Sequence, residues 1–417
     1  MSATPTVQTE PSLTPILDRL TPIPEVKNVS KPRWYGLIAA ISAVCLPLVF
    51  IGLIIWSPTF LTSAERITRP AQHFLDTSLD SIFFDWGPLI TFALLPFLLF
   101  AVIIVHEIGH FVCGLCVGFR LMSIRFGPLR ISPPFRISVK FEPKTGASGG
   151  VIMIPGKSTN LRSRAVVFIL GGPVANLLAG SSILFLKLGG PVAAVSATLS
   201  ILIGAANLVP FRRLALISDG KRLLMLLKNA EQGERWLAIL QLAAELRSGI
   251  EPENLSPDFI AKAIAVRDES PDTAAGYVFA YTAAWYKDAP DKAAQLLETC
   301  LEYSQFCAPI MREALRCSAA VFQGRKRNRI DLAEQWLSEI PEKTLYPGLR
   351  LQAESAILEA RGDIGDALKQ LDEVETALMT IHDSYQRSVS LRSLQRWRLE
   401  LVEKQASAVA QESQTIA

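Results

Sequence analysis

The sequence predicts a mainly α-helical protein in two parts: a polytopic membrane helix bundle of about four spans with a small cytosolic β element, and a C-terminal α-helical domain. Three observations support this fold class. Half of the 417 residues are hydrophobic, which is too apolar for an ordinary soluble chain of this length. The apolar residues gather in blocks before residue 229. The sequence after them is charged and rich in Ala, Leu, Glu and Arg, as soluble helical domains are.

We therefore expect four segments along the chain. Residues 1–33 are rich in Ser, Thr and Pro and lack periodicity, which predicts a disordered N-terminal tail. Residues 34–228 hold the apolar blocks and form the transmembrane domain. Residues 229–404 form the cytosolic helical domain, and residues 405–417 are expected to be a flexible tail.

Four apolar blocks are long enough to cross a hydrocarbon core, which takes about 20 helical residues. Pro47 interrupts the first block, as membrane helices tolerate. A Gly-Gly-Pro turn signal separates the last two blocks. The blocks cover residues 35–56, 88–105, 165–188 and 191–210.

The distribution of Lys and Arg between these blocks predicts their orientation. The segment between the second and third blocks is strongly basic, whereas the segment between the first two holds only Arg66 and Arg69 beside several acidic residues. Lys and Arg accumulate on the cytoplasmic side of membrane proteins, so the N-terminus, residues 111–164 and the chain after residue 211 are expected in the cytosol. We expect a multi-pass protein of the bacterial inner membrane. The net charge of +3 is too small to indicate nucleic-acid binding.

The basic segment between the second and third blocks contains four runs of apolar and β-branched residues, separated by Pro and Gly. This pattern predicts a small β-sheet at the cytosolic membrane face. The sheet either plugs the mouth of the bundle or offers an exposed strand edge to an extended substrate segment. The runs are residues 121–126, 129–131, 135–141 and 150–154.

The motif that carries chemistry is His-Glu-Ile-Gly-His at residues 106–110, at the end of the second block. Residues four apart share a helical face, so His106 and His110 can bind one zinc ion with Glu107 beside it as general base. Polar residues inside an apolar span are costly unless they bind something. A polar helix end without metal is the alternative. The other two histidines, in polar stretches, are expected to be solvated: His73 and His382.

A catalytic zinc site needs a third protein ligand and one position open for water. Cys113 shares a face with the two histidines, but on a straight helix it lies about 10 Å of rise from His106, too far to bind the same ion. Asp219 is the better candidate, because it follows the last block and would reach the same cytosolic face. Taken alone, however, Asp219 is better explained as the N-cap of a helix that starts near Lys221.

Three elements, in chain order, resemble the site-2 protease family of intramembrane zinc metallopeptidases. The first is the motif at residues 106–110. The second is Gly-Gly-Pro-Val-Ala-Asn at residues 171–176, and the third is Asn-Leu-Val-Pro at residues 207–210 followed by Asp219-Gly220. The resemblance covers residues 85–230.

This resemblance implies zinc as the cofactor, with His106, His110 and Asp219 as its ligands and Glu107 as the catalytic base. The implied activity is hydrolysis of peptide bonds in a transmembrane protein substrate within the lipid bilayer. In such a reaction Glu107 takes a proton from the zinc-activated water and passes it to the leaving amine.

The chain also departs from the family pattern. The stretch before Asp219 is longer than the family's compact form, and no segment resembles the PDZ domain of many relatives. Asn176 and Asn207 lie in apolar surroundings, where the resemblance suggests that they hold substrate backbone or an oxyanion. Hydrogen bonding between helices explains them equally well. Gly171 and Gly172 are better explained by close helix approach than by chemistry.

The C-terminal domain shows helical segments with small and large apolar residues, recurring at intervals of about 34 to 40 residues. This pattern predicts a tetratricopeptide-like domain, although the full consensus is absent; a plain helical bundle is the alternative. A stack of helix pairs presents a concave surface that suits a cytosolic regulator or substrate tail. The segments are residues 291–301, 331–340 and 366–378.

Two functions from other classes remain open. One is a protein of the same fold that has lost proteolysis and acts as a membrane scaffold or transporter-like chaperone, against which the intact residues His106, Glu107 and His110 speak. The other is a membrane anchor whose function lies in the helical domain as an adaptor.

Overall fold

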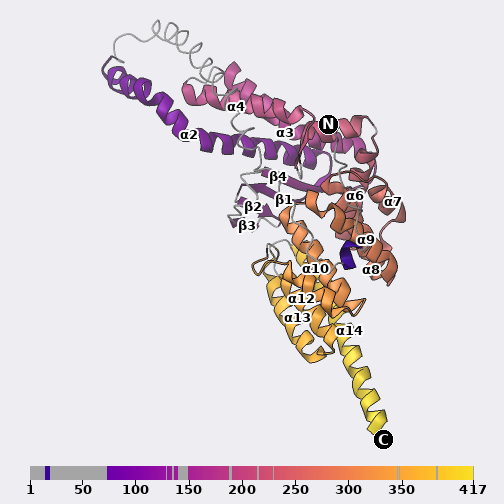
Figure 1. The fold of residues 1–417 in the computed structure, drawn as a ribbon. Coiled ribbons are helices and arrows are strands. Elements are labelled where there is room, and N and C mark those ends of the chain that lie inside the picture. The colour runs from indigo at the N-terminus through magenta and orange to yellow at the C-terminus, as the bar shows by residue number, and fades with distance from the viewer. Residues whose placement is uncertain are drawn as a thin grey trace, which may run out of the picture. The chain divides into compact units, whose positions relative to one another are not determined.

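The computed structural model forms two compact units (Figure 1). Lys27–Gly233, which we call the apolar unit, is one, and Met1–Val26 together with Glu234–Ala417, which we call the helical unit, is the other. The predicted span at residues 35–56 lies outside the described residues. The structure describes residues 15–18, 73–127, 129–133, 136–139, 149–186, 190–213, 216–228, 230–344, 346, 348–381 and 384–416.

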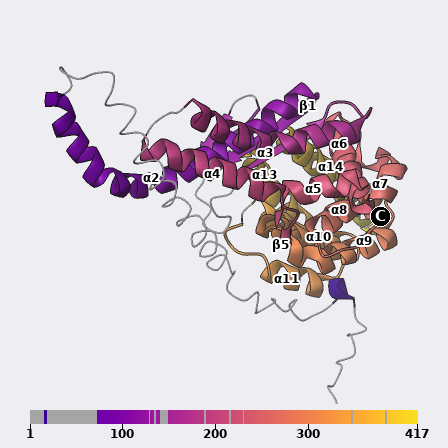
Figure 2. The same cartoon turned by 90° about the horizontal axis from the view of Figure 1, so that it is seen from above.

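Three helices of the apolar unit pack side by side (Figures 1 and 2). They are α2 (His73–Cys116), α3 (Leu161–Phe185) and α4 (Pro191–Leu208). The α2 helix begins earlier and ends later than the predicted second span. It continues through the histidine motif because residues 111–116 contain no proline and are mostly apolar, and it ends just before Gly118, whose φ of 76° is easily adopted only by glycine.

The outer faces of these helices suit a lipid environment. Thr91–Cys116 and Leu161–Phe185 are long and apolar enough to cross a membrane, and Val192–Leu208 is a shorter apolar helix. The helices are not the buried core of a soluble domain, because Phe97 on α2 is 70% exposed and Phe185 on α3 is 85% exposed. An apolar surface of this kind marks contact with a membrane or another protein.

The predicted β element is confirmed as an antiparallel four-stranded sheet against α2, in the order β3-β2-β1-β4. Among the described residues, β4 pairs with β1 alone, so β4 is an edge strand. The strands are β1 (Phe119–Phe126), β2 (Leu129–Ser132), β3 (Arg136–Val139) and β4 (Gly149–Pro155).

The helical unit consists of helices that pair along the chain, α8 with α9, α10 with α11 and α12 with α13. Three of them confirm the predicted helical segments, whereas the tetratricopeptide likeness stays a prediction. The elements are α6 (Glu231–Arg247), η2 (Pro252–Asn254), α7 (Pro257–Ile264), α8 (Pro271–Tyr286), α9 (Pro290–Glu302), η3 (Tyr303–Phe306), α10 (Pro309–Arg325), α11 (Ile330–Ser338), α12 (Leu349–Arg361), α13 (Ile364–Met379) and α14 (Ser384–Ile416).

The two predicted tails need correction. The prediction of a disordered N-terminal tail is wrong for residues 15–18, because the 3₁₀ helix η1 (Ile16–Asp18) buries Leu17 in the core of the helical unit. At the other end, α14 continues to Ile416 through the segment predicted to be a flexible tail. That segment contains no Gly or Pro to end the helix.

A buried arginine joins the first helices of the helical unit. Arg235 on α6 is fully buried. Its guanidinium donates to the carboxylate of Asp268 at 2.8 Å, to Ser270 Oγ at 3.0 Å and to Thr273 Oγ1 at 3.0 Å. A further hydrogen bond, of 3.1 Å, reaches the carbonyl of Val266. This Arg235 network fixes the connection between α7 and α8.

Candidate metal centre

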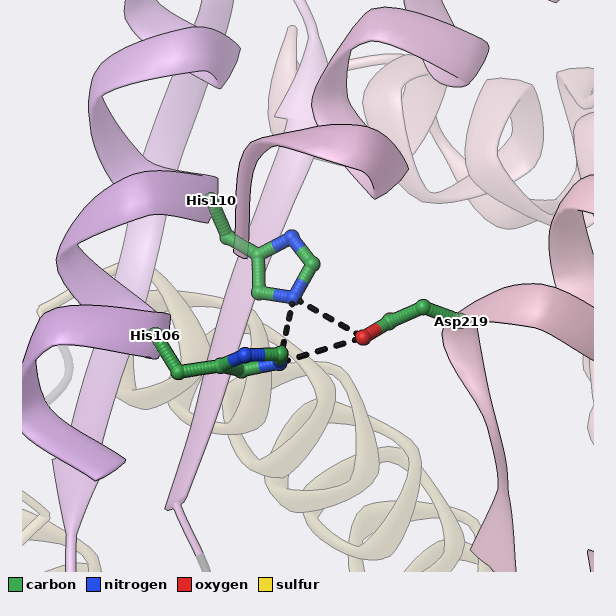
Figure 3. Close-up of side chains that lie close together, drawn as sticks. All are labelled: His106, His110 and Asp219. Atoms are coloured by element: carbon green, nitrogen blue, oxygen red, sulfur yellow. Dashed lines mark hydrogen bonds and ion pairs between the residues drawn. The ribbon is translucent and has the colours of Figure 1, made fainter. Parts of the chain in front are cut away.

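Two imidazoles meet at the middle of the site. His106 and His110 lie one turn apart on α2, both buried, with their Nε2 atoms 3.2 Å apart (Figure 3). The rings meet edge to face at an interplanar angle of 84°. The i, i+4 spacing places both imidazoles on one face of α2, as predicted, with their Nε2 atoms directed to one point.

Asp219 completes a triangle with these two nitrogens. It is the first residue of α5 (Asp219–Leu227), and Figure 3 shows its carboxylate facing the histidines from the opposite side. Asp219 Oδ2 lies 3.1 Å from His106 Nε2 and 3.4 Å from His110 Nε2. A tetrahedral zinc ion holds its nitrogen and oxygen ligands roughly 3.3 Å from one another. Among the described residues, these three side chains form a group that could hold a metal ion.

The hydrogen bonds of His110 leave its inward nitrogen free to bind a cation. The carbonyl oxygen of Phe168 lies 2.9 Å from Nδ1, so Nδ1 carries the proton and donates it. The lone pair of Nε2 then faces His106 and Asp219. The side chain of Asp219 is a carboxylate, which is ionised at neutral pH. An ionised carboxylate and imidazole lone pairs converging on one point need a cation between them, which fits zinc.

Asn176 stands behind His106. It is fully buried on α3, with its amide nitrogen 3.3 Å from His106 Nδ1, and its carboxamide oxygen has no hydrogen-bond partner among the described residues. Turning the amide over would let this oxygen accept the Nδ1 proton of His106. Histidines that bind a metal commonly donate their other N–H in this way. The orphaned oxygen therefore also fits a metal centre.

Asn207 has a different environment. Its carboxamide is half-buried on α4 and donates to the carbonyl of Ile203, one turn back on the same helix, at 3.2 Å.

Glycines let α2 and α3 approach closely at the site. A Cβ at Gly109 would lie 2.3 Å from the carbonyl oxygen of Gly171, and one at Gly171 would lie 2.4 Å from that of Gly109. Close helix approach, as predicted, explains Gly171. Gly172 has a further role, because its Cβ would lie 2.3 Å from His110 Nε2 and 2.8 Å from His106 Nε2. Any side chain at Gly172 would enter the space beside the ligand nitrogens.

The long stretch before Asp219 folds back on itself. Its strands β5 (Arg212–Arg213) and β6 (Leu216–Ile217) pair as a small antiparallel hairpin. At the end of the hairpin, the hydroxyl of Ser218 donates to the carbonyl of Val209 at 2.8 Å. The additional residues therefore return the chain to the end of α4, and the departure from the compact family pattern does not displace the aspartate.

Ser218, not Asp219, caps α5. Its Oγ accepts the backbone N–H of Lys221 at 3.1 Å, so the interpretation of Asp219 as the N-cap is wrong. Gly220 sets the position of α5, since a Cβ there would lie 1.9 Å from the carbonyl oxygen of Leu208. The cap and this close contact direct the Asp219 carboxylate to the histidines.

Part of the site lies in a segment that matches a known protein family. Residues 94–191 match Peptidase family M50. The resemblance to the site-2 protease family is thereby confirmed, and this family comprises membrane-embedded, zinc-dependent intramembrane metalloproteases. No curated protein and no solved structure matches the chain. The M50 segment contains both histidines and Asn176, and it ends before Asp219, so the third corner of the triangle rests on geometry.

Within the M50 segment, Glu107 lies against the start of β4, an edge strand among the described residues. Its side chain is buried, and a Cβ at Gly149, the first residue of β4, would lie 2.4 Å from Glu107 Oε1. Sequence reasoning missed Gly149. The Gly149-Gly150 pair is a weak local signal, and nothing local shows which side chain approaches it.

The remaining polar residues named from the sequence do not join the triangle. Cys113 is a half-buried free thiol on α2, and the group of described residues that could hold a metal does not include it. The side chains of His73 and His382 lie outside the described residues.

Proposed function

We propose that this protein is an intramembrane zinc metalloprotease that hydrolyses peptide bonds of membrane-embedded protein substrates. The observation that carries the proposal is the convergence of His106, His110 and Asp219, with ligand atoms 3.1 to 3.4 Å apart and Glu107 next in the chain to His106. The match of the surrounding segment to Peptidase family M50 supports the same reaction.

The residues of the site take two kinds of role: three would bind the zinc ion, and others act beside it. Nε2 of His106, Nε2 of His110 and Oδ2 of Asp219 would hold the zinc ion, which when bound activates water and polarises the scissile carbonyl. Glu107 would accept the water proton and deliver it to the leaving amine. The carbonyl of Phe168 orients His110.

The two asparagines take separate roles in this proposal. Asn176 acts through His106, because its amide contacts the ring nitrogen that faces away from the ligand triangle. Asn207 stays the candidate for holding substrate backbone or the oxyanion.

The free edge of β4 is the proposed docking site for the substrate. An extended peptide can add to an exposed strand edge through main-chain hydrogen bonds. Because Gly149 at the start of β4 contacts Glu107, a strand added there would run beside the general base. Glycine at this position leaves room for the carboxylate and keeps the edge accessible.

Partners and location complete the proposal. We place the protein in the bacterial inner membrane, with the zinc site and the helical unit on the cytosolic side, following the distribution of Lys and Arg. The helical unit would bind the cytosolic tail of a substrate or a regulator.

The direct test combines zinc analysis with one substitution. Purified full-length protein should contain one zinc ion per chain. Glu107→Gln should retain the zinc and lower cleavage of a helix-destabilised model membrane substrate by roughly 10²- to 10⁴-fold, since the general base is lost. Glu403→Gln, an exposed carboxylate on α14, is the matched control and should cleave normally. Normal turnover by Glu107→Gln would overturn the protease assignment.

A further inference from the structure

The helical unit binds a short piece of the N-terminal tail much as a receptor binds a peptide. The segment Pro15–Asp18, indigo in Figure 1, lies against α9. It is separated along the chain from the residues that contact it by 281 to 319 positions. Leu17 is only 2% exposed and lies in the main apolar cluster of the unit, and Ile16 packs against that cluster.

Side chains of the helical unit bind the backbone of this segment. The N–H groups of Ile16 and Leu17 donate to the two carboxylate oxygens of Glu298 on α9, at 2.6 and 2.8 Å. The carbonyl of Leu17 accepts from Gln323 Nε2 on α10 at 2.7 Å and from Trp336 Nε1 on α11 at 3.1 Å. Three main-chain groups of two consecutive residues are thus bound by side chains, not by a neighbouring strand or helix.

The same site also selects side chains. Leu17 packs within the apolar cluster, and the carboxylate of Asp18 accepts from Gln323 Nε2 at 3.0 Å and pairs with the guanidinium of Arg327. The order apolar, apolar, acidic is therefore matched by the apolar cluster, against which Ile16 and Leu17 pack, and by the cationic side chain of Arg327. Such a combination of backbone and side-chain contacts is typical of short-peptide recognition.

Two of the four recognising residues lie in the core of the unit. Gln323 is fully buried and Trp336 is 1% exposed, so their positions do not depend on solvent-exposed side chains. The bound segment has little structure of its own to hold it in place: η1 has one internal backbone hydrogen bond, from Asp18 N–H to the carbonyl of Pro15 at 3.0 Å. Most of what orders these residues comes from the site.

We propose that Glu298, Gln323, Arg327 and Trp336 form a binding site for a short peptide that presents an apolar, apolar, acidic turn, and that Pro15–Asp18 is its exchangeable resident ligand. A partner segment of the same chemistry displaces the resident segment and occupies the site. The inference rests on contacts within the helical unit and does not depend on proteolysis.

A tethered ligand blocks its own site effectively. An intramolecular segment is present at an effective concentration that a free peptide must exceed, which weakens the apparent affinity for that peptide. Wild-type protein should therefore bind a free copy of the segment poorly, and protein with a damaged resident segment should bind it well.

The experiment measures fluorescence anisotropy of a fluorescein-labelled peptide with the sequence of residues 11–22, titrated with detergent-solubilised full-length protein. Leu17→Asp in the protein should bind the peptide at least tenfold more tightly than wild type, because the resident competitor is lost. Adding Gln323→Ala to Leu17→Asp should abolish this gain. A peptide with Asp in place of its leucine at position 17 should not bind.

Two further variants keep the test decisive. Asp18→Ala removes only the rim contacts and leaves Leu17 in its pocket, so this protein should fold and bind the peptide about threefold more tightly than wild type. Leu399→Asp, which alters a leucine that is 65% exposed on α14, should bind like wild type. The proposal fails if folded Leu17→Asp and Asp18→Ala proteins both bind no better than wild type, or if the gain survives Gln323→Ala. If Leu17→Asp does not fold, Asp18→Ala alone decides.

Discussion

The two units each hold a half-buried carboxylate among polar groups, but only one of these clusters is complete by itself. In the helical unit, Asp268 faces the guanidinium of Arg235, which has five N–H donors and finds acceptors on several sides. In the apolar unit, Asp219 faces two imidazole nitrogens whose lone pairs point to the same place. The Arg235 network supplies its own cation, and so it stabilises the fold. The metal triangle lacks one, and so it is suited to bind a metal.

The clusters also differ in how far they reach along the chain. The partners of Arg235 lie 31 to 38 residues away, in the connection between α7 and α8 and in the first turn of α8. His106 and Asp219 lie 113 residues apart and meet only after α2, α3, α4 and α5 have packed. A structural network can form locally, whereas the metal triangle depends on the whole apolar unit.

The largest expected effect is loss of metal on removing the aspartate. Asp219→Ala should lower zinc affinity by more than the 10- to 100-fold typical of residues that only support a ligand. The comparison variant is Ser218→Ala, which removes the cap of α5 but keeps the carboxylate. It should destabilise the protein by about 1 kcal/mol and lower zinc affinity far less than Asp219→Ala does. Competition with a chromogenic chelator measures both. Full zinc occupancy in Asp219→Ala would remove Asp219 from the ligand set.

The next largest expected effect is on the stability of the helical unit, and it tests the Arg235 network. Arg235→Ala leaves Asp268 without its guanidinium partner and should destabilise the helical unit by about 3 to 5 kcal/mol. Denaturant unfolding followed by tryptophan fluorescence measures this change, and zinc content should not change. Arg329, which is exposed and pairs with Asp331 at the surface, is the control, and Arg329→Ala should unfold like wild type. Equal stability of the two variants would show that the network contributes little.

A smaller effect on zinc affinity is expected at Asn176, which contacts the ligand His106 but would not bind the metal itself. Asn176→Leu removes the amide that faces His106 Nδ1 while keeping a similar volume, and should lower zinc affinity by about 10- to 100-fold. Asn207→Leu should leave zinc affinity unchanged, because the Asn207 amide bonds within its own helix. Wild-type affinity in Asn176→Leu would favour a direct role with the substrate over positioning of His106.

The smallest effect is the pH dependence of the Arg235 network. Burial alone raises the pKa of Asp268, but hydrogen bonds from Arg235, Ser270 and Thr273 outweigh it and hold the pKa well below its usual value of 3.8. The folded state binds this proton less readily than the unfolded state, so the resulting stability is present above pH 3.8 and is lost as the pH falls through the lowered pKa. Below pH 3.8, the melting temperature should therefore fall more steeply in wild type than in Asp268→Asn. Parallel curves would contradict this assignment.

Local patterns predicted much of the site and the fold. The i, i+4 spacing within residues 106–110 is enough to put two histidines on one helical face, because helix geometry alone decides that contact. Runs of apolar residues separated by Pro or Gly predicted the strands at residues 119–155, because this signal is also local in the chain. The ends of α2 did not follow from the sequence pattern, since the apolar block ends before the helix does.

By itself, the sequence determined the periodic helices and strands, the histidine pair with its glutamate, and the division between an apolar and a charged part, because each depends on residues close together in the chain. Only the tertiary structure decided that Asp219 reaches the two histidines, that Gly172 leaves room beside the ligand nitrogens, and that Leu17 is bound within the helical unit. These contacts join residues between about 60 and 320 positions apart. Packing brings them together, and no local pattern of hydrophobicity or charge encodes which distant backbone will lie against a given side chain.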